Sequence, residues 1–164
     1  MWESTPMRRK DRLLPTEEAE KLLAGAEYGI LASASGEGVP LATPLNFVYA
    51  GGNIYFHSAK QGQKLRNIAA QPRVSFCVVG KTQPVYEDGH FTTSYESAVV
   101  KGKAGFVEEG AEKTKILLAL CQKYLPAHMD KADDYIAKGL AATCVVRVEI
   151  EQLAGKARRG GSVG

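Results

Sequence analysis

The order of apolar and polar residues along the chain predicts a mainly β protein with flanking helices. After Thr16, a candidate N-cap, apolar residues recur at helical spacing, and this first helix is expected to end near Gly25. Six later segments alternate in polarity or are rich in β-branched and aromatic residues, which is typical of strands. They are 28–33, 39–49, 54–57, 74–79, 98–107 and 143–151.

Short connections join the first three predicted strands. Residues 35–38 and 50–53 are rich in glycine and polar turn residues, so these strands are expected to be antiparallel. Two further helices are predicted at 111–124 and 130–138. Residues 80–95 mix a proline, glycines and hydroxyl side chains and are expected to form a functional or mobile loop. Six strands with short early connections favour a small closed barrel flanked by helices.

The junction after the third predicted strand carries the strongest candidate chemistry. The strand ends at His57, and Ser58 and Gln61 form a Ser-x-x-Gln capping box that predicts a helix start. Lys60 and Lys64 fall in the first two turns of this helix. A helix start exposes backbone N–H groups and the positive end of the helix dipole, and the lysines add charge. The junction therefore predicts a phosphate-binding site.

Composition narrows the class of protein. The 164 residues are 45% hydrophobic and 24% charged, as in an ordinary soluble globular domain. The net charge of +3 is too small to imply nucleic acid as a partner, and the basic clusters near both ends either contact phosphates or are solvated. The three cysteines lack C-x-x-C spacing and are expected to be reduced and buried. The histidines have no metal-like spacing, so no metal site is expected.

The sequence also indicates the location of the protein and its division into domains. No apolar run approaches the roughly 18–20 residues of a membrane-spanning helix. The first ten residues lack the apolar core of a secretory signal, so a cytoplasmic location is expected. We expect an N-terminal arm at 1–15, one domain at 16–157 and a flexible basic tail at 158–164.

With these elements placed, the sequence resembles the FMN-binding split-barrel superfamily related to pyridoxamine 5'-phosphate oxidase. Within it, the sequence is most similar to the Nim-type nitroimidazole-resistance flavoproteins. The resemblance spans about residues 7–157 and rests on the order and spacing of short pieces. These pieces are MRRKDR at 7–12, YGILA at 28–32, PLNFVY at 44–49, IYFHSA at 54–59, GQKL at 62–65, QPRV at 71–74, TSYES at 93–97 and GKA at 155–157.

The resemblance implies a six-stranded antiparallel split β-barrel that forms a homodimer, with two FMN molecules in grooves between the subunits. Three groups of cofactor-binding residues are expected. The strand along the isoalloxazine ring comprises Thr43, Pro44, Leu45 and Asn46. The group around the phosphate comprises His57, Ser58, Gln63 and Lys64, to which the capping-box prediction adds Lys60. The group that approaches from the partner subunit or the adjacent loop comprises Ser94, Tyr95 and Ser97.

The resemblance also implies an FMN-dependent oxidoreductase that passes electrons from reduced flavin to a small flat acceptor such as a nitroaromatic. A reduced nicotinamide is one expected electron donor. His57 is the candidate catalytic residue, delivering protons or electrons near the flavin; alternatively, it ends its strand and hydrogen-bonds phosphate or backbone. The aromatic rings of Tyr86, Phe91 and Tyr95 either form a substrate wall or anchor their loop.

Other functions stay open at this point. Split barrels also serve as non-catalytic flavin-binding or haem-binding modules, and fold alone does not decide function. FAD or a deazaflavin could occupy the same groove as FMN. A true pyridoxamine 5'-phosphate oxidase activity is disfavoured, because the chain's final residues, 156–164, carry neither the aromatic nor the Arg-x-His elements of that enzyme.

Overall fold

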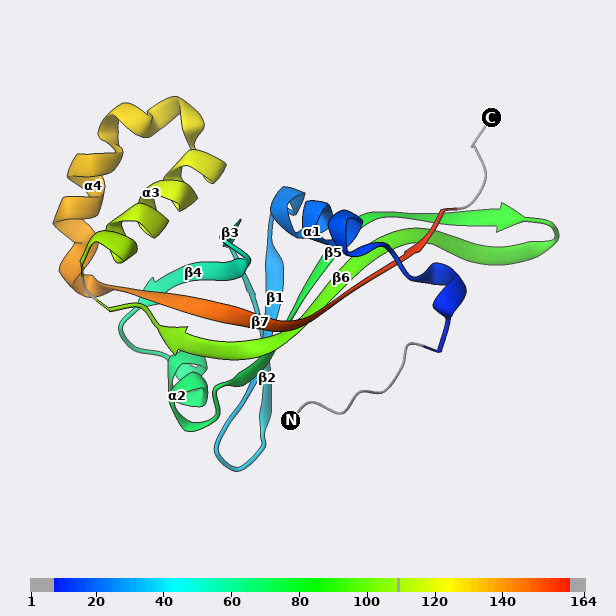
Figure 1. The fold of residues 1–164 in the computed structure, drawn as a ribbon, viewed down its shortest axis with the longest axis horizontal. Coiled ribbons are helices and arrows are strands. Elements are labelled where there is room, and N and C mark those ends of the chain that lie inside the picture. The colour runs from blue at the N-terminus through cyan, green and yellow to red at the C-terminus, as the bar shows by residue number, and fades with distance from the viewer. Residues whose placement is uncertain (1–7, 109, 160–164) are drawn as a thin grey trace.

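The computed structural model describes residues 8–108 and 110–159 (Figure 1). Seven strands form one sheet in the order β2-β1-β5-β6-β7-β4-β3, and every pair of neighbours is antiparallel. The strands are β1 Gly29–Ala34, β2 Pro40–Leu45, β3 Val48–Ala50, β4 Asn53–Ala59, β5 Arg73–Glu87, β6 His90–Phe106 and β7 Thr143–Arg158. The helices are α1 Thr16–Gly25, α2 Gln63–Ala70, α3 Ala111–Tyr124 and α4 Ala132–Gly139, with short 3-10 turns at Lys10–Arg12, Pro126–Lys131 and Leu140–Ala142.

The main core lies inside the curled sheet. Alternate residues of the strands point inward, which gives β1 its regular buried–exposed pattern. The largest side chains that are fully enclosed include Phe47, Phe56 and Phe76, and the rings of Phe47 and Phe76 meet edge to face at 4.8 Å. Helix α1 adds Ala19 and Leu23 to this core.

A second apolar cluster holds α3 and α4 against the outer face of β4 and β7. Its buried members are Tyr55, Ile116, Leu117, Leu120, Ile136 and Val145. Figure 1 shows these two helices grouped at the end of the molecule where β7 begins, on the side opposite the long β5–β6 hairpin. The layering therefore leaves β4, α2 and the α3–α4 pair around one end of the molecule.

The prediction of a mainly antiparallel β fold with flanking helices is confirmed, but the sheet has seven strands and not six. The predicted strand 39–49 is interrupted at Asn46 and Phe47. The Phe47 N–H donates to the Tyr124 hydroxyl oxygen at 3.0 Å, and the Phe47 carbonyl accepts from Lys123 Nζ at 3.0 Å. Because side chains of α3 take both backbone groups, Phe47 leaves the sheet and the strand divides into β2 and β3.

The predicted loop at 80–95 is wrong. These residues extend β5 and β6 into a hairpin whose tip, at Asp88 and Gly89, has positive φ values of 50° and 77°. Pro84 faces Thr93 across the hairpin. A proline is tolerated there because β1 pairs only with residues 75–77 of β5, which leaves this edge of the hairpin unpaired.

The structure also tests the predictions for the first helix and for the cysteines. Helix α1 begins at Thr16 with Pro15 at the N-cap and no side-chain cap bond, so the N-cap prediction is wrong, although the helix ends at Gly25 as expected. Strand β6 shifts its register against β7 between Lys101 and Gly102, and a Cβ at Gly102 would collide with the Glu149 carbonyl. Among the described residues the three cysteines form no disulfide, and they are partly exposed rather than buried. No helix within 8–108 and 110–159 is long and apolar enough to cross a bilayer.

Candidate functional site

The β4–α2 junction is built differently from its sequence prediction. Strand β4 continues to Ala59, and Ser58 pairs with Cys144 of β7, so Ser58 is held within the sheet and is buried. Helix α2 begins only at Gln63, and no side chain caps it. The capping-box prediction is therefore wrong, and Lys60 lies in the connecting loop and not in the helix.

Gly62 is the residue that turns this loop into the helix. Its φ of 144° is one that side-chain-bearing residues rarely adopt, and a Cβ there would meet nothing within 4 Å, so backbone conformation and not space requires glycine. The first helical hydrogen bond runs from Arg66 N–H to the Gly62 carbonyl at 3.2 Å. The N–H groups of the residues between Gly62 and Arg66 have no helical acceptor and remain available to an anion.

A buried polar bridge fixes the start of α2 to the sheet. Gln63 Nε2 donates to Asn67 Oδ1 at 2.8 Å, and Asn67 Nδ2 donates to Ser33 Oγ of β1 at 3.1 Å. Asn67 and Ser33 are only 1% and 5% exposed. The sequence analysis missed Asn67, whose signal is a polar residue on the buried face of α2. The bridge brings Gln63 close to β1 and its neighbour β2.

His57 and Lys64 come together beside this junction. His57 lies one position before Ser58 on β4 and points to the opposite face of the strand. Partial burial lowers the pKa of His57 below 6.5, and the positive charge of Lys64 lowers it further. The imidazole is therefore predominantly neutral at pH 7 and lies within electrostatic reach of Lys64.

The predicted isoalloxazine strand forms one edge of the sheet. In β2, Thr43 and Leu45 are half-buried and face the core side, while Pro44 is exposed on the other face; Asn46 follows in the connection to β3. Among the described residues, β2 pairs only with β1, so its second edge carries no strand from that part of the chain.

Side chains of helix α3 hold the chain just after the strip Thr43–Asn46, and we call these contacts the α3 clamp. The sequence analysis missed this feature. The Tyr124 hydroxyl donates to the Glu27 carbonyl at 2.7 Å while it accepts from the Phe47 N–H. Lys123 Nζ donates a hydrogen bond to the Phe47 carbonyl and also lies 4.1 Å from the centre of the Phe47 ring. Burial lowers the pKa of Lys123. Lys123 and Phe47 are 76 positions apart in the sequence, so no local sequence pattern predicts their contact.

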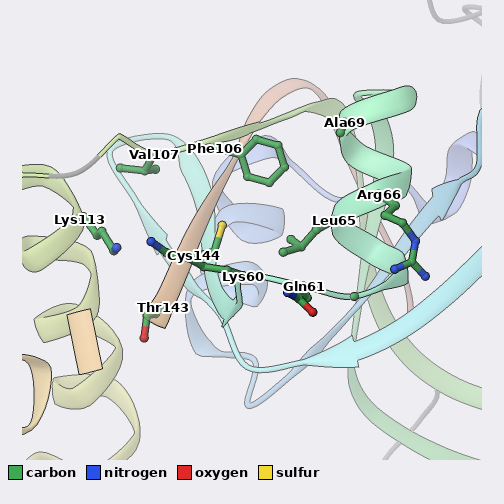
Figure 2. Close-up of a pocket in the computed structure, with 11 residues that line it drawn as sticks. Lys60, Gln61, Leu65, Arg66, Ala69, Phe106, Val107, Lys113, Thr143 and Cys144 are labelled. Atoms are coloured by element: carbon green, nitrogen blue, oxygen red, sulfur yellow. The ribbon is translucent and has the colours of Figure 1, made fainter. Parts of the chain in front are cut away.

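Two cavities flank the junction. One of about 570 Å³ lies between α2 and the start of α3, and Lys60, Gln61 and Gly62 line it (Figure 2). A smaller one of about 120 Å³ lies between β4 and the α3–α4 pair, with His57 in its wall. Thr143 lines both cavities. Gln63, Lys64 and Ser58 line neither of them.

The third predicted group lies at the other end of β7. Ser97 pairs with Lys156, whereas Ser58 pairs with Cys144. Cys144 and Lys156 are twelve positions apart on β7, which corresponds to about 40 Å along an extended strand. Figure 1 shows the hairpin projecting away from α2. The structure therefore does not bring Ser94, Tyr95 and Ser97 to the junction within one chain, which makes the adjacent-loop alternative untenable.

The hairpin carries its own contacts. Arg12 donates to the Tyr95 hydroxyl at 3.5 Å, and the Ser94 hydroxyl donates to the Arg158 carbonyl at 3.0 Å. Near the tip, the rings of Tyr86 and Phe91 pack at a tilt of 52°, with their centroids 4.9 Å apart. Within the described residues, no three His, Cys, Asp or Glu side chains gather in a way that could hold a metal ion.

Comparison with known proteins supports this picture of the fold. Residues 15–157 match the family model for pyridoxamine 5'-phosphate oxidase. No curated protein matches the sequence.

Several solved structures share the fold. A candidate 5-nitroimidazole antibiotic resistance protein from Bacteroides thetaiotaomicron is 23% identical, with 88% of this chain and 85% of that chain covered and a TM-score of 0.73. A conserved hypothetical protein from Mycobacterium tuberculosis is 20% identical, covering 97% and 98% of the two chains with a TM-score of 0.80. A flavocytochrome from Azotobacter vinelandii is 19% identical, covering 97% of this chain and 75% of that one with a TM-score of 0.80.

Proposed function

The chain belongs to the pyridoxamine 5'-phosphate oxidase family, and we propose that it is an FMN-dependent oxidoreductase that reduces a small flat acceptor such as a nitroaromatic. The observation that carries this proposal is the β4–α2 junction, where Lys64, His57 and the uncapped first turn of α2 lie together. A similar structure titled a candidate nitroimidazole resistance protein supports the choice of acceptor.

The donors at the junction fit the phosphate of FMN. Lys64 supplies a positive charge, Gln63 an amide, Ser58 a hydroxyl, and the first turn of α2 supplies backbone N–H groups. We propose that these three residues and the backbone N–H groups hold the phosphate; Lys60 is in the loop beside them and stays a prediction.

The edge of β2 fits a flat ring. Its open backbone groups can hydrogen-bond the polar edge of an isoalloxazine, and the α3 clamp on Phe47 holds the strip from Thr43 to Asn46 in place. The Asn67–Ser33 bridge ties α2 to β1, the strand that pairs with β2. Rigid placement of both ends favours a preorganised cofactor site.

FMN, when bound, would supply the electron or hydride transfer. The protein's own contribution is to position the acceptor and to move protons. His57 is neutral at pH 7 because of its lowered pKa, so it can accept a proton at one ring nitrogen while the other ring nitrogen donates a hydrogen bond. The small cavity beside the imidazole has an apolar wall that includes Leu117, Leu120 and Ile136.

We also propose that the active form is a homodimer. The distance between Ser97 and Ser58 means that both groups can reach one flavin only if they come from different chains. The sheet offers a surface for this contact, because Ile30, Cys77 and Val99 form one row across β1, β5 and β6 on the face that no helix covers. Tyr28 and Val79, which are 57% and 54% exposed, extend the apolar area.

An anaerobic reoxidation assay tests the enzymatic function. The protein is reconstituted with FMN, reduced without oxygen, and mixed with a 5-nitroimidazole while flavin absorbance is recorded. We expect reoxidation at least about tenfold faster than with free reduced FMN, because the site positions the acceptor. A rate equal to that of free flavin would favour the non-catalytic flavin- or haem-binding module.

The His57→Ala variant separates the two roles of the histidine. If His57 moves protons, reoxidation slows by about a hundredfold while FMN affinity stays nearly unchanged. Loss of FMN binding instead would assign His57 to phosphate or backbone contact. Mass spectrometry of the chromophore released from purified protein distinguishes FMN from FAD, deazaflavin and haem, and a reduced nicotinamide is the first electron donor to assay.

A further inference from the structure

The larger cavity has walls from five parts of the chain. Leu65, Arg66 and Ala69 of α2 form one side, and the opposite side consists of the end of β6, the start of α3 and the start of β7 (Figure 2). Its volume of about 570 Å³ lies within the range of small-molecule sites. The loop from Lys60 to Gly62 closes a third side.

This cavity is separate from the proposed phosphate site. Residues of an α-helix are about 100° apart around the axis, so Arg66 and Ala69 lie about 140–200° from Lys64. Gln63 and Asn67 mark the side of α2 that faces β1. Lys64 therefore lies on the side of α2 away from Arg66 and Ala69, and neither Lys64 nor Gln63 lines the cavity.

The cavity combines apolar walls with positive charge. Leu65, Ala69, Phe106, Val107 and Cys144 form the apolar part, and Phe106 is 48% exposed although it is large and hydrophobic. Three cations, Lys60, Arg66 and Lys113, line it, and none of the described lining residues is acidic.

The cations are placed at both ends of the apolar wall. Figure 2 shows the ammonium groups of Lys60 and Lys113 turned toward one another at one end and Arg66 at the other. Lys113 is only 1% exposed and donates to the Leu140 carbonyl at 2.8 Å. Arg66 donates to the neutral Gln63 Oε1 at 2.7 Å, a contact that leaves the guanidinium charge in place. Such a lining attracts anions and at the same time favours apolar surface.

We propose that this cavity is a second binding site, distinct from the flavin site, for a small amphipathic anion. The apolar body of the ligand lies over Leu65 and Phe106, and its carboxylate or phosphate faces the cationic lining. Both the apolar body and the anionic group of the ligand contribute to binding. Electrostatic attraction alone would be screened by salt at an open site. Apolar contact alone would not favour this cavity over the exposed apolar face of the sheet.

Decanoate and its uncharged counterpart decanol test the proposal on the full chain, with binding followed by backbone-amide NMR below the concentration at which decanoate forms micelles. We expect decanoate to shift the amide signals of Leu65, Phe106 and Val107, and decanol to bind at least about tenfold more weakly. Equal binding of the two, or shifts confined to the sheet face around Val99, would overturn the proposal.

Two variants with matched controls locate the ligand. Ala69→Trp fills the cavity and Arg66→Glu reverses a lining charge; each should weaken decanoate binding by about fivefold or more. Ala137→Trp and Arg73→Glu make the same changes at exposed positions outside the cavity and should leave binding unchanged. Decanoate affinity that is the same in all four variants would contradict the proposal. Neither Ala69→Trp nor its control Ala137→Trp alters a side chain that is hydrogen-bonded to the proposed phosphate donors, so FMN titration of these two variants tells a failure of the second site apart from a failure of the flavin site.

Discussion

The β4–α2 junction and the β5–β6 hairpin hold their polar groups in opposite ways. At the junction, Asn67 and Ser33 are shielded from solvent while Gln63 lies at the surface, and each member of the bridge has its partner inside the same chain. Buried hydrogen bonds of this kind fix one geometry, because an unmade bond in the interior is costly.

The hairpin is held by contacts at the surface. Arg159 pairs with Glu18 at 2.6 Å and with Glu96 at 3.1 Å, and Arg158 pairs with Glu87 at 2.9 Å. Solvated pairs of this kind contribute about 0–1 kcal/mol each. Arg158 also keeps one guanidinium nitrogen, Nη1, buried and without a partner among the described residues, and Phe91 at the tip is 91% exposed.

The difference indicates which half of the proposed flavin site is complete. The junction is organised within the monomer, so its geometry does not depend on another molecule. The hairpin projects away with exposed aromatic rings and partly satisfied polar groups, which is typical of a surface that a second body covers. We infer that dimerisation supplies the hairpin half of the site.

Mixing two inactive variants gives the largest effect and tests this inference directly. Lys64→Glu disables the junction and Ser97→Glu disables the hairpin, and each alone should weaken FMN binding by about a hundredfold. If one flavin site uses Lys64 of one chain and Ser97 of another, an equal mixture after subunit exchange should regain about a quarter of the sites, because half of the dimers are mixed and each has one intact site. FMN fluorescence quenching measures the recovery.

The control for this mixture is Val99→Arg in both chains, which places a charge in the apolar row of the sheet. It should abolish recovery and yield a monomer in light scattering without unfolding the protein, since Val99 is 38% exposed. Absence of recovery in the original mixture would show that the hairpin does not reach a partner's junction.

Local patterns predicted the elements whose causes are local. The helix predicted at 111–124 coincides with α3, because its apolar spacing and Pro126 mark both the face and the end. The hairpin was missed because neither of its faces is continuously apolar, and a strand is recognised from sequence mainly where one face is apolar.

Features that depend on distant contacts could not be predicted. Ser58 and Gln61 satisfy the capping-box pattern, but pairing with Cys144, far along the chain, holds Ser58 in β4 and displaces the helix start. The same holds for Asn67, whose partner Ser33 is 34 positions away, and for the α3 clamp that divides the predicted second strand. For the site, the sequence indicated the junction and His57 but neither cavity.

Removing the buried bridge should give an intermediate effect. Asn67→Leu leaves the Ser33 hydroxyl buried without its donor, so we expect the free energy of unfolding to fall by about 1–3 kcal/mol. Ser33→Ala added to Asn67→Leu should restore part of this loss, because both partners are then apolar. Urea unfolding of the single and double variants measures the coupling, and Gln63→Ala, which removes only the partly exposed bond, should cost less.

FMN affinity in the same variants then shows whether the bridge positions the site. If it sets the distance between β2 and α2, Asn67→Leu weakens FMN binding even under conditions in which the variant is fully folded. Unchanged FMN affinity alongside reduced stability would limit Asn67 to a structural role.

The smallest expected effect concerns the proton affinity of His57. Burial is the larger cause of its lowered pKa and the positive charge of Lys64 is the smaller one. The Lys64→Gln variant removes the smaller cause, so the pKa should rise toward 6.5. NMR titration of the His57 ring measures the change. Lys60→Gln, in the neighbouring loop, is the matched control and should have less influence, because Lys64 is the charge that contributes to the lowered pKa.

The same shift links stability at the junction to pH. A histidine whose pKa is lower in the folded state binds protons more readily when unfolded, so its contribution to stability is complete well above pH 6.5 and is lost as pH falls from 6.5 through the folded-state pKa. Urea unfolding at pH 7.5 and pH 5.5 should therefore show a smaller pH-dependent loss in Lys64→Gln than in the wild type, and no His57 contribution at all in His57→Ala. An identical loss in all three proteins would mean that His57 and Lys64 are not coupled, and the junction would then lack the electrostatic contact on which its proposed proton chemistry depends.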